Sequence, residues 1–357
     1  MAGMSIASEL SSTHSVIVLE QEAQLAHHAT GRSAAAFLES YGGPEVRALT
    51  RASRPLLEAA AVDAPLLTRR PLLWIAGPER EPVIAEMCRQ QPRLEGLSPA
   101  DAQRMCPVVR TDWLAAAAVE PDAQDIDVAG LHQVYVRSAR RNGVTVERDS
   151  RVSEATYDGR AWRLRQASGT VSAPVVVDAA GAWADHVARL FGARPCGLRA
   201  LRRTVVIART GQPVATSWPL VADVDDTFYF RPDGPHVLAS PADETPSEPC
   251  DARPEEADVA RAIERVNLAT TLGIRSVVTT WAGLRTFAAD RVPVMGYDPD
   301  APGLFWLAGQ GGYGIQTAPA LARLAAVILR GDVSPSAEAP GLDPEALSPA
   351  RFRATTA

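Results

Sequence analysis

The sequence predicts an α/β protein with a doubly wound, Rossmann-like domain and a second domain built on a mixed sheet. Three patterns support this. A helix over 5–10 precedes a β-branched strand over 16–19, the strand over 175–177 is continuously apolar, and strand-like runs dominate 198–290. A continuously apolar strand is typical of a parallel sheet that is buried on both faces. With 357 residues, the chain is long enough for two domains.

The first helix and strand form half of a familiar motif. Gly3 stands at the helix start, and Glu20 ends the strand. This is the second half of a dinucleotide-binding βαβ unit, in which the helix start faces the pyrophosphate and the carboxylate binds a ribose hydroxyl. The first strand and the first two glycines of G-x-G-x-x-G have no counterpart after Met1. We therefore expect an N-terminally truncated motif, from a late start or a truncated gene copy.

The later elements alternate between the two expected domains. Helices are predicted over 47–57, 82–89, 127–141, 256–268 and 317–329, a hairpin is predicted around 158–159, and the proline-rich acidic stretch 241–254 is expected to be a solvated loop. The dinucleotide domain is predicted to comprise 1–60, 121–197 and 282–335, and the second domain 61–120 and 198–281. The tail, 336–357, is expected to lie over the surface.

Composition excludes several classes of protein. The net charge is −6 and no basic stripe occurs, which argues against a nucleic-acid partner. No apolar run is long enough to span a bilayer, and the N-terminus lacks a signal-peptide pattern. We therefore expect no transmembrane segment and a cytoplasmic location.

Residue types that are rare or missing narrow the chemistry further. All 36 basic residues are arginine, so neither a Schiff-base lysine nor a P-loop lysine is available. The four widely spaced cysteines, Cys88, Cys106, Cys196 and Cys250, are expected to be reduced and unpaired. The six histidines are scattered and form no H-E-x-x-H motif, so we expect no metal site.

Four segments together resemble a known family. They are His28-Ala-Thr-Gly-Arg-Ser-Ala-Ala35, Asp178-Ala-Ala-Gly-Ala-Trp183, Trp281-Ala-Gly-Leu-Arg285 and Gln310-Gly-Gly-Tyr-Gly-Ile-Gln316. In this order they are similar to the FAD-dependent D-amino-acid oxidase and dehydrogenase superfamily, and most of all to the bacterial D-arginine dehydrogenases. The likeness covers nearly the whole chain, from Gly3 to 347–352. It implies an FAD enzyme that transfers a hydride from a D-amino acid Cα to flavin N5. The resulting imino acid hydrolyses to a 2-keto acid and ammonia.

The resemblance also implies which residues bind FAD. The glycines of 310–316 would let the backbone pass close to the flavin ring, and the following helix start would stabilise negative charge on reduced flavin. Purely structural roles stay open for some of these residues: 30–33 could simply cap a helix, Glu20 could be an exposed carboxylate, and Gly181 could serve packing. The predicted cofactor residues are Ala2, Gly3, Glu20, Gln21, His28, Thr30, Gly31, Arg32, Ser33, Ala34, Val152, Ala180, Gly181, Gly311, Gly312, Tyr313, Gly314, Ile315 and Gln316.

An amino-acid substrate needs a cation for its carboxylate, and a buried arginine binds a carboxylate bidentately. By family position, Arg285 is the first candidate, and Arg203 is the second unless the match slips by one residue to Arg202. The hydroxyls of three tyrosines are predicted to assist, although each ring could instead be a core aromatic: Tyr41, Tyr229 and Tyr313. No catalytic residue is assigned, because an amine that binds neutral needs no strong base, and His28 is expected to belong to the cofactor loop.

Two positions, Leu72 and Ala36, depart from the D-arginine dehydrogenase pattern, and a third, Glu39, bears on the choice of substrate. Leu72 stands where a glutamate would receive a guanidinium, and Ala36 replaces a histidine of the active-site loop. An apolar residue cannot balance a buried cation, so a neutral or hydrophobic substrate side chain is favoured over arginine. Glu39 could partly compensate if its loop turns inward. The alternatives are a glycine- or sarcosine-type amine oxidase on the same fold and an inactive, truncated chain without cofactor. Oxygen or a respiratory quinone is the expected electron acceptor.

Overall fold

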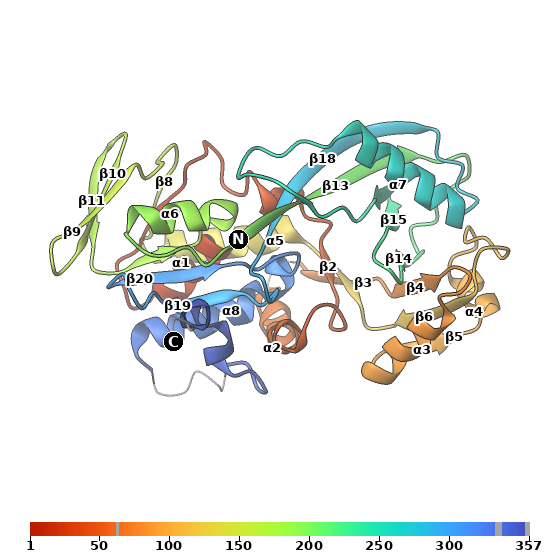
Figure 1. Ribbon diagram of the computed structural model, residues 1–357, viewed down its shortest axis with the longest axis horizontal. Helices are drawn as coiled ribbons and strands as arrows, with labels where there is room; N and C mark the ends of the chain where they lie inside the picture. The colour runs from red at the N-terminus through yellow and green to blue at the C-terminus, as the bar shows by residue number, and fades with distance from the viewer. Residues whose placement is uncertain (62–63, 333–337, 354–357) are drawn as a thin grey trace.

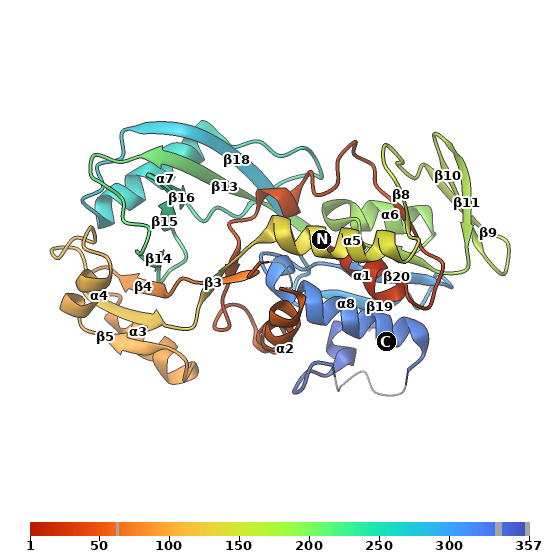
Figure 2. The same ribbon diagram turned by 180° about the vertical axis from the view of Figure 1, so that it is seen from behind.

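The computed structural model describes residues 1–61, 64–332 and 338–353. Figure 1 shows an elongated molecule with a small sheet of β9 (Glu154–Tyr157), β10 (Trp162–Gln166) and β11 (Gly169–Ala173) at one end. At the other end lie β4 (Leu72–Ala76), β5 (Glu95–Leu97) and β6 (Ala116–Glu120), with α3 (Glu81–Gln90) and α4 (Pro99–Met105). The two halves are joined by long strands, which the reverse view in Figure 2 also shows.

The half that carries the predicted dinucleotide motif is an α/β layer. β1 (Ile17–Leu19) pairs in parallel with β8 (Thr145–Glu147), and β12 (Val176–Asp178) pairs in parallel with β20 (Leu304–Ala308). β19 (Val294–Tyr297) adds an antiparallel edge to β20. The helices of this half are α1 (Ala2–Leu10), α2 (Pro44–Ala60), α5 (Val128–Arg141), α6 (Ala184–Leu190) and α8 (Gly314–Arg330).

One apolar core holds this layer together. Ile6 of α1, Leu49 of α2, Phe305 of β20 and Leu324 of α8 belong to a single buried cluster. Apolar residues at helical spacing on α1 and α8 therefore cover the strands, as the sequence pattern predicts. Asp127 caps α5 by accepting a hydrogen bond from the Gly130 backbone N–H at 2.8 Å. The predicted α/β fold class is confirmed.

The parallel strands of this layer do not form one continuous sheet. Among the described residues, β1 has β8 as its only neighbour, and β12 has only β20. The residues of β1 and of β12 both line the same large cavity. The cavity therefore separates two partial sheets, and backbone groups along one edge of each lack a strand partner.

The second half is built on a nine-stranded sheet. Its longest strands, β13 (Arg199–Arg209) and β18 (Ser276–Phe287), pair antiparallel with Leu201 opposite Arg285. The remaining strands continue the sheet through β14 (Leu220–Asp223), β15 (Tyr229–Asp233), β16 (His236–Ser240), β17 (Thr245–Pro246), β4, β6 and β5. The helix α7 (Glu256–Ala269) contributes Ala262 and Val266 to the core against this sheet. A third, small sheet joins β2 (Ala36–Phe37), β7 (Gln124–Ile126) and β3 (Leu67–Arg69).

Three expectations need correction. β18 runs unbroken through 276–287, so a boundary at 281/282 would cut one strand. The stretch 241–254 is not merely a solvated loop, because Ala242 and Asp243 are buried. The described part of the tail does not only lie over the surface, because Leu347 is fully buried. In each case a long-range contact decides the structure, and local composition does not show it.

The expectation for the cysteines agrees with the structure. The cysteines Cys88, Cys106, Cys196 and Cys250 are all unpaired. Within the described part of the chain, no helix has the length and apolar character needed to cross a bilayer.

Candidate active site

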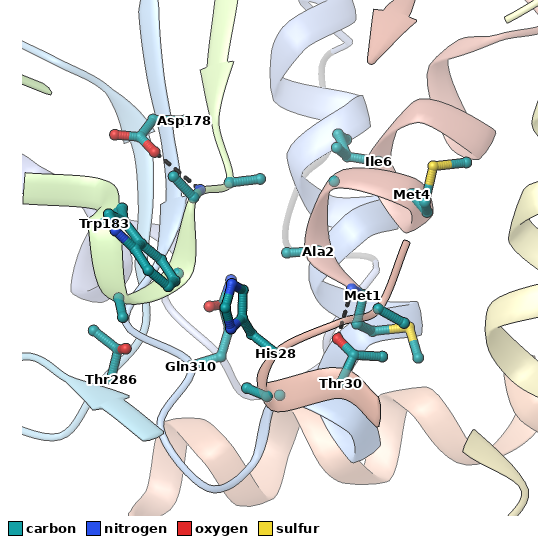
Figure 3. A pocket seen from close by; sticks show the side chains of 18 of the residues that line it. Met1, Ala2, Met4, Ile6, His28, Thr30, Asp178, Trp183, Thr286 and Gln310 are labelled. Carbon is teal, nitrogen blue, oxygen red and sulfur yellow. Dashed lines mark hydrogen bonds between the residues drawn. The ribbon is translucent and has the colours of Figure 1, made fainter. Parts of the chain in front are cut away.

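A cavity of about 1400 Å³ runs along the α/β layer and ends under the nine-stranded sheet. Pockets for small ligands are typically about 300–1,000 Å³, so this one has room for a dinucleotide and a substrate together. It brings together all four segments that carry the family resemblance. Figure 3 shows one part of it, with Asp178 and Trp183 on one side and Met1, Ala2 and Thr30 on the other.

Most of the predicted cofactor residues line this cavity. Gly31 and Tyr313 do not. The Gly31 backbone N–H donates to the Ala26 carbonyl at 2.9 Å, and a side chain at Gly31 would run into that oxygen. Gly31 therefore shapes the loop from behind. The residues that do line the cavity are Ala2, Gly3, Glu20, Gln21, His28, Thr30, Arg32, Ser33, Ala34, Val152, Ala180, Gly181, Gly311, Gly312, Gly314, Ile315 and Gln316.

The start of α1 opens into this part of the cavity. A Cβ built on Gly3 would stand 3.7 Å from the Ala179 Cβ, so the helix begins against the end of β12. The Met1 amino group donates to Thr30 Oγ1 at 2.9 Å, which joins this helix start to the turn Ala29–Arg32 (Figure 3). The first N–H groups of a helix lack intrahelical partners and bind anions. This end of the cavity therefore fits a pyrophosphate.

His28 lies in the middle of the same region. Its Nε2 is 2.9 Å from Glu22 Oε1, and its ring packs against Trp183 with centroids 4.6 Å apart. Glu22, His27 and His28 place three possible metal ligands within 4.8 Å of one another. The expectation that the chain holds no metal site stays a prediction. The hydrogen bond to Glu22 and the contact with Trp183 give His28 a fixed orientation in the cavity wall.

Two predicted cofactor side chains are already engaged within the protein. The Arg32 guanidinium donates to the carbonyls of Ala252 and Ala282 at 2.9 and 3.0 Å and also pairs with Asp251. The Gln316 amide binds the Leu38 backbone in both directions, at 3.1 and 3.2 Å. These side chains hold the loops around the cavity, so what Arg32 and Gln316 offer a cofactor is their backbone and the position they fix.

The glycines of 311–312 have a role that their motif does not reveal. Gly311 has φ +55°, and a Cβ there would lie under 3.0 Å from three atoms of the Phe287 ring. A Cβ on Gly312 would lie 2.7 Å from Arg285 Nη1. The missing side chains thus make room for Phe287 and Arg285, both on β18, in addition to leaving the backbone open to the cavity.

Asp178 is a cavity residue that begins one of the four sequence segments but to which the sequence analysis assigned no role. Its Oδ1 accepts from the Ala180 N–H at 3.0 Å, and its buried Oδ2 has no partner. Burial raises the Asp178 pKa to about 7, and the nearby Asp185 adds to this, although the Ala180 hydrogen bond opposes it. The signal was present in the sequence, as a carboxylate that ends an otherwise apolar strand.

This carboxyl group makes stability depend on pH. Asp178 has a pKa of about 7 in the folded state and 3.8 in the unfolded state. Between these pH values the folded state therefore binds more protons than the unfolded state, so the free energy of unfolding falls as pH rises through them. The shift corresponds to at most about 4 kcal/mol, since one pKa unit is about 1.4 kcal/mol. We expect Asp178→Asn, which can keep the hydrogen bond to Ala180, to raise Tm clearly at pH 8 and little at pH 4.5. Thermal unfolding at both pH values tests this, and an equal change at both would contradict it.

The part of the cavity under the nine-stranded sheet carries two arginines. Arg285 and Arg203 lie on neighbouring strands and on the same face, because Leu201 is opposite Arg285 and Arg203 is two residues further. Both line the cavity, and Arg203 is only 7% exposed. Arg202 points elsewhere, to Asp258 at 2.9 Å and to Glu255, so of the neighbouring pair it is Arg203 that reaches the cavity.

Tyrosine hydroxyls accompany the arginines. Arg285 Nη1 is 3.5 Å from the Tyr41 hydroxyl, and the Arg203 guanidinium lies 5.8 Å from the Tyr229 ring centre. Burial raises the Tyr41 pKa to about 12, so this hydroxyl stays protonated. Tyr313 lies outside the cavity wall and packs against Tyr41 at 5.0 Å, where burial likewise raises its pKa to about 12. Tyr313 thus supports Tyr41 from behind.

An apolar wall faces the arginines. Leu72, Trp74, Leu220 and Ala222 line the cavity and belong to one buried cluster. Glu39 does not line it: its carboxylate is buried against Arg54 Nε at 2.7 Å and Arg93 Nη2 at 3.1 Å. Glu39 therefore cannot balance a substrate cation. Its partners, Arg54 and Arg93, lie 15 and 54 residues further along the chain.

The sequence matches the family of FAD dependent oxidoreductases (DAO) over residues 1–328. The chain therefore belongs to this family, whose cofactor is FAD. The residues fit that cofactor, because a helix start, the carboxylate of Glu20 just after β1 and a glycine-rich loop all open into one cavity.

Known proteins with similar sequences are distant. The chain is 25% identical to mouse mitochondrial sarcosine dehydrogenase over 58% of its own length and 24% of that protein. It is 24% identical to glycine oxidase from Geobacillus kaustophilus over 63% of its length and 59% of that protein. The chain thus spans about a quarter of the length of the mitochondrial dehydrogenases that it matches.

Solved structures share the fold. L-proline dehydrogenase from P. horikoshii superimposes with a TM-score of 0.84 at 18% identity, covering 99% of this chain and 95% of that one. Glycine oxidase from Geobacillus kaustophilus gives 0.80 at 21% identity, covering 97% and 95%.

Proposed function

We propose that this oxidoreductase oxidises the Cα–N bond of an amino acid with an uncharged side chain. One observation carries the proposal: a single cavity joins a helix start and glycine-rich loop suited to FAD with two buried arginines suited to a carboxylate. The apolar wall around Leu72 favours a neutral substrate side chain and disfavours arginine, because Leu72 and its neighbours offer a buried cation no partner. The acid Asp226 also lines the cavity, but it lies 4.0 Å from Arg203 Nη2. A D-amino acid is the first candidate, in keeping with the resemblance to D-arginine dehydrogenases.

The roles of the residues follow from their positions. Arg285, assisted by Arg203, binds the substrate carboxylate and so fixes the orientation of the Cα–H bond. The neutral hydroxyls of Tyr41 and Tyr229 donate hydrogen bonds to the substrate at its carboxylate end. Leu72 and Trp74 keep water from the side-chain end. When bound, FAD supplies the acceptor for the hydride that leaves Cα. The imino acid product then hydrolyses to a 2-keto acid and ammonia.

A second candidate is a glycine- or sarcosine-type amine oxidation. The names of two relatives, sarcosine dehydrogenase and glycine oxidase, favour it. Both reactions use the same carboxylate site, so they differ in the size and configuration of the substrate. The electron acceptor, oxygen or a quinone-type compound, and a cytoplasmic location stay predictions.

A substrate panel tests the proposal. The FAD-loaded chain would be assayed with an artificial electron acceptor and, separately, by oxygen consumption. The panel pairs D- and L-alanine, D- and L-leucine, D- and L-phenylalanine and D- and L-arginine with glycine and sarcosine. We expect turnover of neutral D-amino acids and little of arginine. Turnover of glycine and sarcosine alone would select the second candidate, and no turnover of any compound by flavin-loaded protein would refute both.

A further inference from the structure

We propose that the Glu244 carboxylate engages Arg285 in the free protein, competes there with the substrate carboxylate and must release Arg285 when substrate binds. This inference rests on the proposed function, because it concerns the same arginine site. It makes Glu244 a residue that sets the affinity for carboxylates without itself binding them.

Three guanidinium groups converge on Glu244. Its Oε1 lies 2.8 Å from Arg285 Nη2, 3.7 Å from Arg203 Nη2 and 3.2 Å from Arg291 Nη1. Its Oε2 also pairs with Arg291 Nη2. A carboxylate bound to Arg285 and Arg203 is what the proposed substrate would supply. Glu244 does not line the cavity itself, but its carboxylate already binds the same arginines, so it competes with the substrate for them.

Glu244 satisfies this site incompletely. Arg285 Nε and Arg203 Nη2 are both buried without a hydrogen-bond partner. A buried donor with no acceptor is unfavourable, so the pair of arginines retains unused capacity for an anion. The other nearby acid, Asp226, is 4.0 Å from Arg203 Nη2, and burial raises its pKa, which weakens it as a counter-charge.

The side chain also has an alternative place to go. Arg291 is half exposed, whereas Arg285 and Arg203 are largely buried, and Arg291 does not line the cavity. Glu244 just precedes β17 at the edge of the sheet and is itself partly exposed. It can therefore keep its contact with Arg291 at the surface while it releases Arg285. Moving the Glu244 carboxylate from Arg285 to Arg291 needs only a rotation of the Glu244 side chain.

Carboxylate binding to the FAD-loaded protein tests this inference. The probe is benzoate, whose carboxylate suits Arg285 and whose ring suits the apolar wall, and its Kd is measured by isothermal titration calorimetry. We expect Glu244→Gln to bind benzoate about ten times more tightly than wild type. Glu244→Asp keeps the charge but has a shorter reach, so it should also tighten binding, by a smaller factor. Because Glu244→Asp keeps the negative charge, tighter benzoate binding by this variant would show that a contact with the arginines was lost, not merely that a charge was removed.

The matched control is Glu248→Gln, an exposed glutamate on the same loop, which should leave the Kd unchanged. Unchanged or weaker benzoate binding in both folded Glu244 variants would overturn the inference. If Glu244→Gln does not fold, the Glu244→Asp result decides. Arg285→Gln separates the two hypotheses. If it abolishes binding while the Glu244 variants behave as wild type, only this inference fails. If it binds benzoate as wild type does, the carboxylate site of the proposed function fails with it.

Discussion

Replacing Arg285 with glutamine is expected to lower kcat/KM for the best amino-acid substrate by roughly 30-fold or more. Truncating one partner of a buried charge pair typically costs about 2–5 kcal/mol, and each 1.4 kcal/mol is a factor of ten in rate. Arg285 lines the cavity and approaches Tyr41, so glutamine removes both the charge and the bidentate geometry at that end. Glu244 keeps Arg291 as a partner, which limits the structural damage.

Steady-state kinetics of the FAD-loaded variant measure this effect, and the bound flavin per chain is determined in the same preparation. The loss should appear with flavin content unchanged, because Arg285 lies at the substrate end of the cavity. Arg89→Gln is the control, since Arg89 forms an exposed pair with Glu86 and should retain full activity. An Arg285 variant with nearly wild-type kcat/KM would remove the proposed carboxylate site.

Replacing Gly311 with alanine is expected to destabilise the protein by about 2–4 kcal/mol and to weaken FAD binding. Two effects add. The positive φ of Gly311 strains any other residue by roughly 1 kcal/mol, and a Cβ would overlap the buried Phe287 ring, where overpacking typically costs about 1–3 kcal/mol. Because Gly311 lines the cavity, relief of the overlap would move the loop that faces the cofactor.

Gly192→Ala separates the two effects. Gly192 has φ +70°, but a Cβ there would meet no atom within 4 Å, so only the backbone strain applies. Chemical denaturation should give a loss near ~1 kcal/mol for Gly192→Ala and a clearly larger one for Gly311→Ala. Equal losses would mean that the contact with Phe287 does not constrain the loop.

Much of the fold follows from the sequence because its signals are local. The apolar strand at 176–178, the Asp127 cap and the helix over 314–330 each have a pattern that fixes the element type. The cavity lining follows less directly. The glycine-rich loop predicts close backbone approach, but only the packed structure shows that Gly311 and Gly312 make room for Phe287 and Arg285.

The partners of charged residues could not be predicted, because they join distant segments. Arg32 is engaged by residues about 220 and 250 positions away, and Arg285 pairs with Glu244 across 41 residues. In an arginine-rich chain with 42 acidic residues, composition does not select among such pairs. Glu39 illustrates the consequence: its loop position suggested the cavity, but Arg54 and Arg93 hold it elsewhere.

The central claim is that one cavity binds FAD between the start of α1 and the glycine-rich loop. The direct measurement is a titration of the purified chain with FAD, followed by desalting and the absorbance of protein-bound flavin, with riboflavin as the comparison. We expect about one FAD retained per chain and much weaker retention of riboflavin, because riboflavin lacks the pyrophosphate that a helix start binds. A folded chain that stays colourless at saturating FAD, or that retains riboflavin equally well, would contradict this claim.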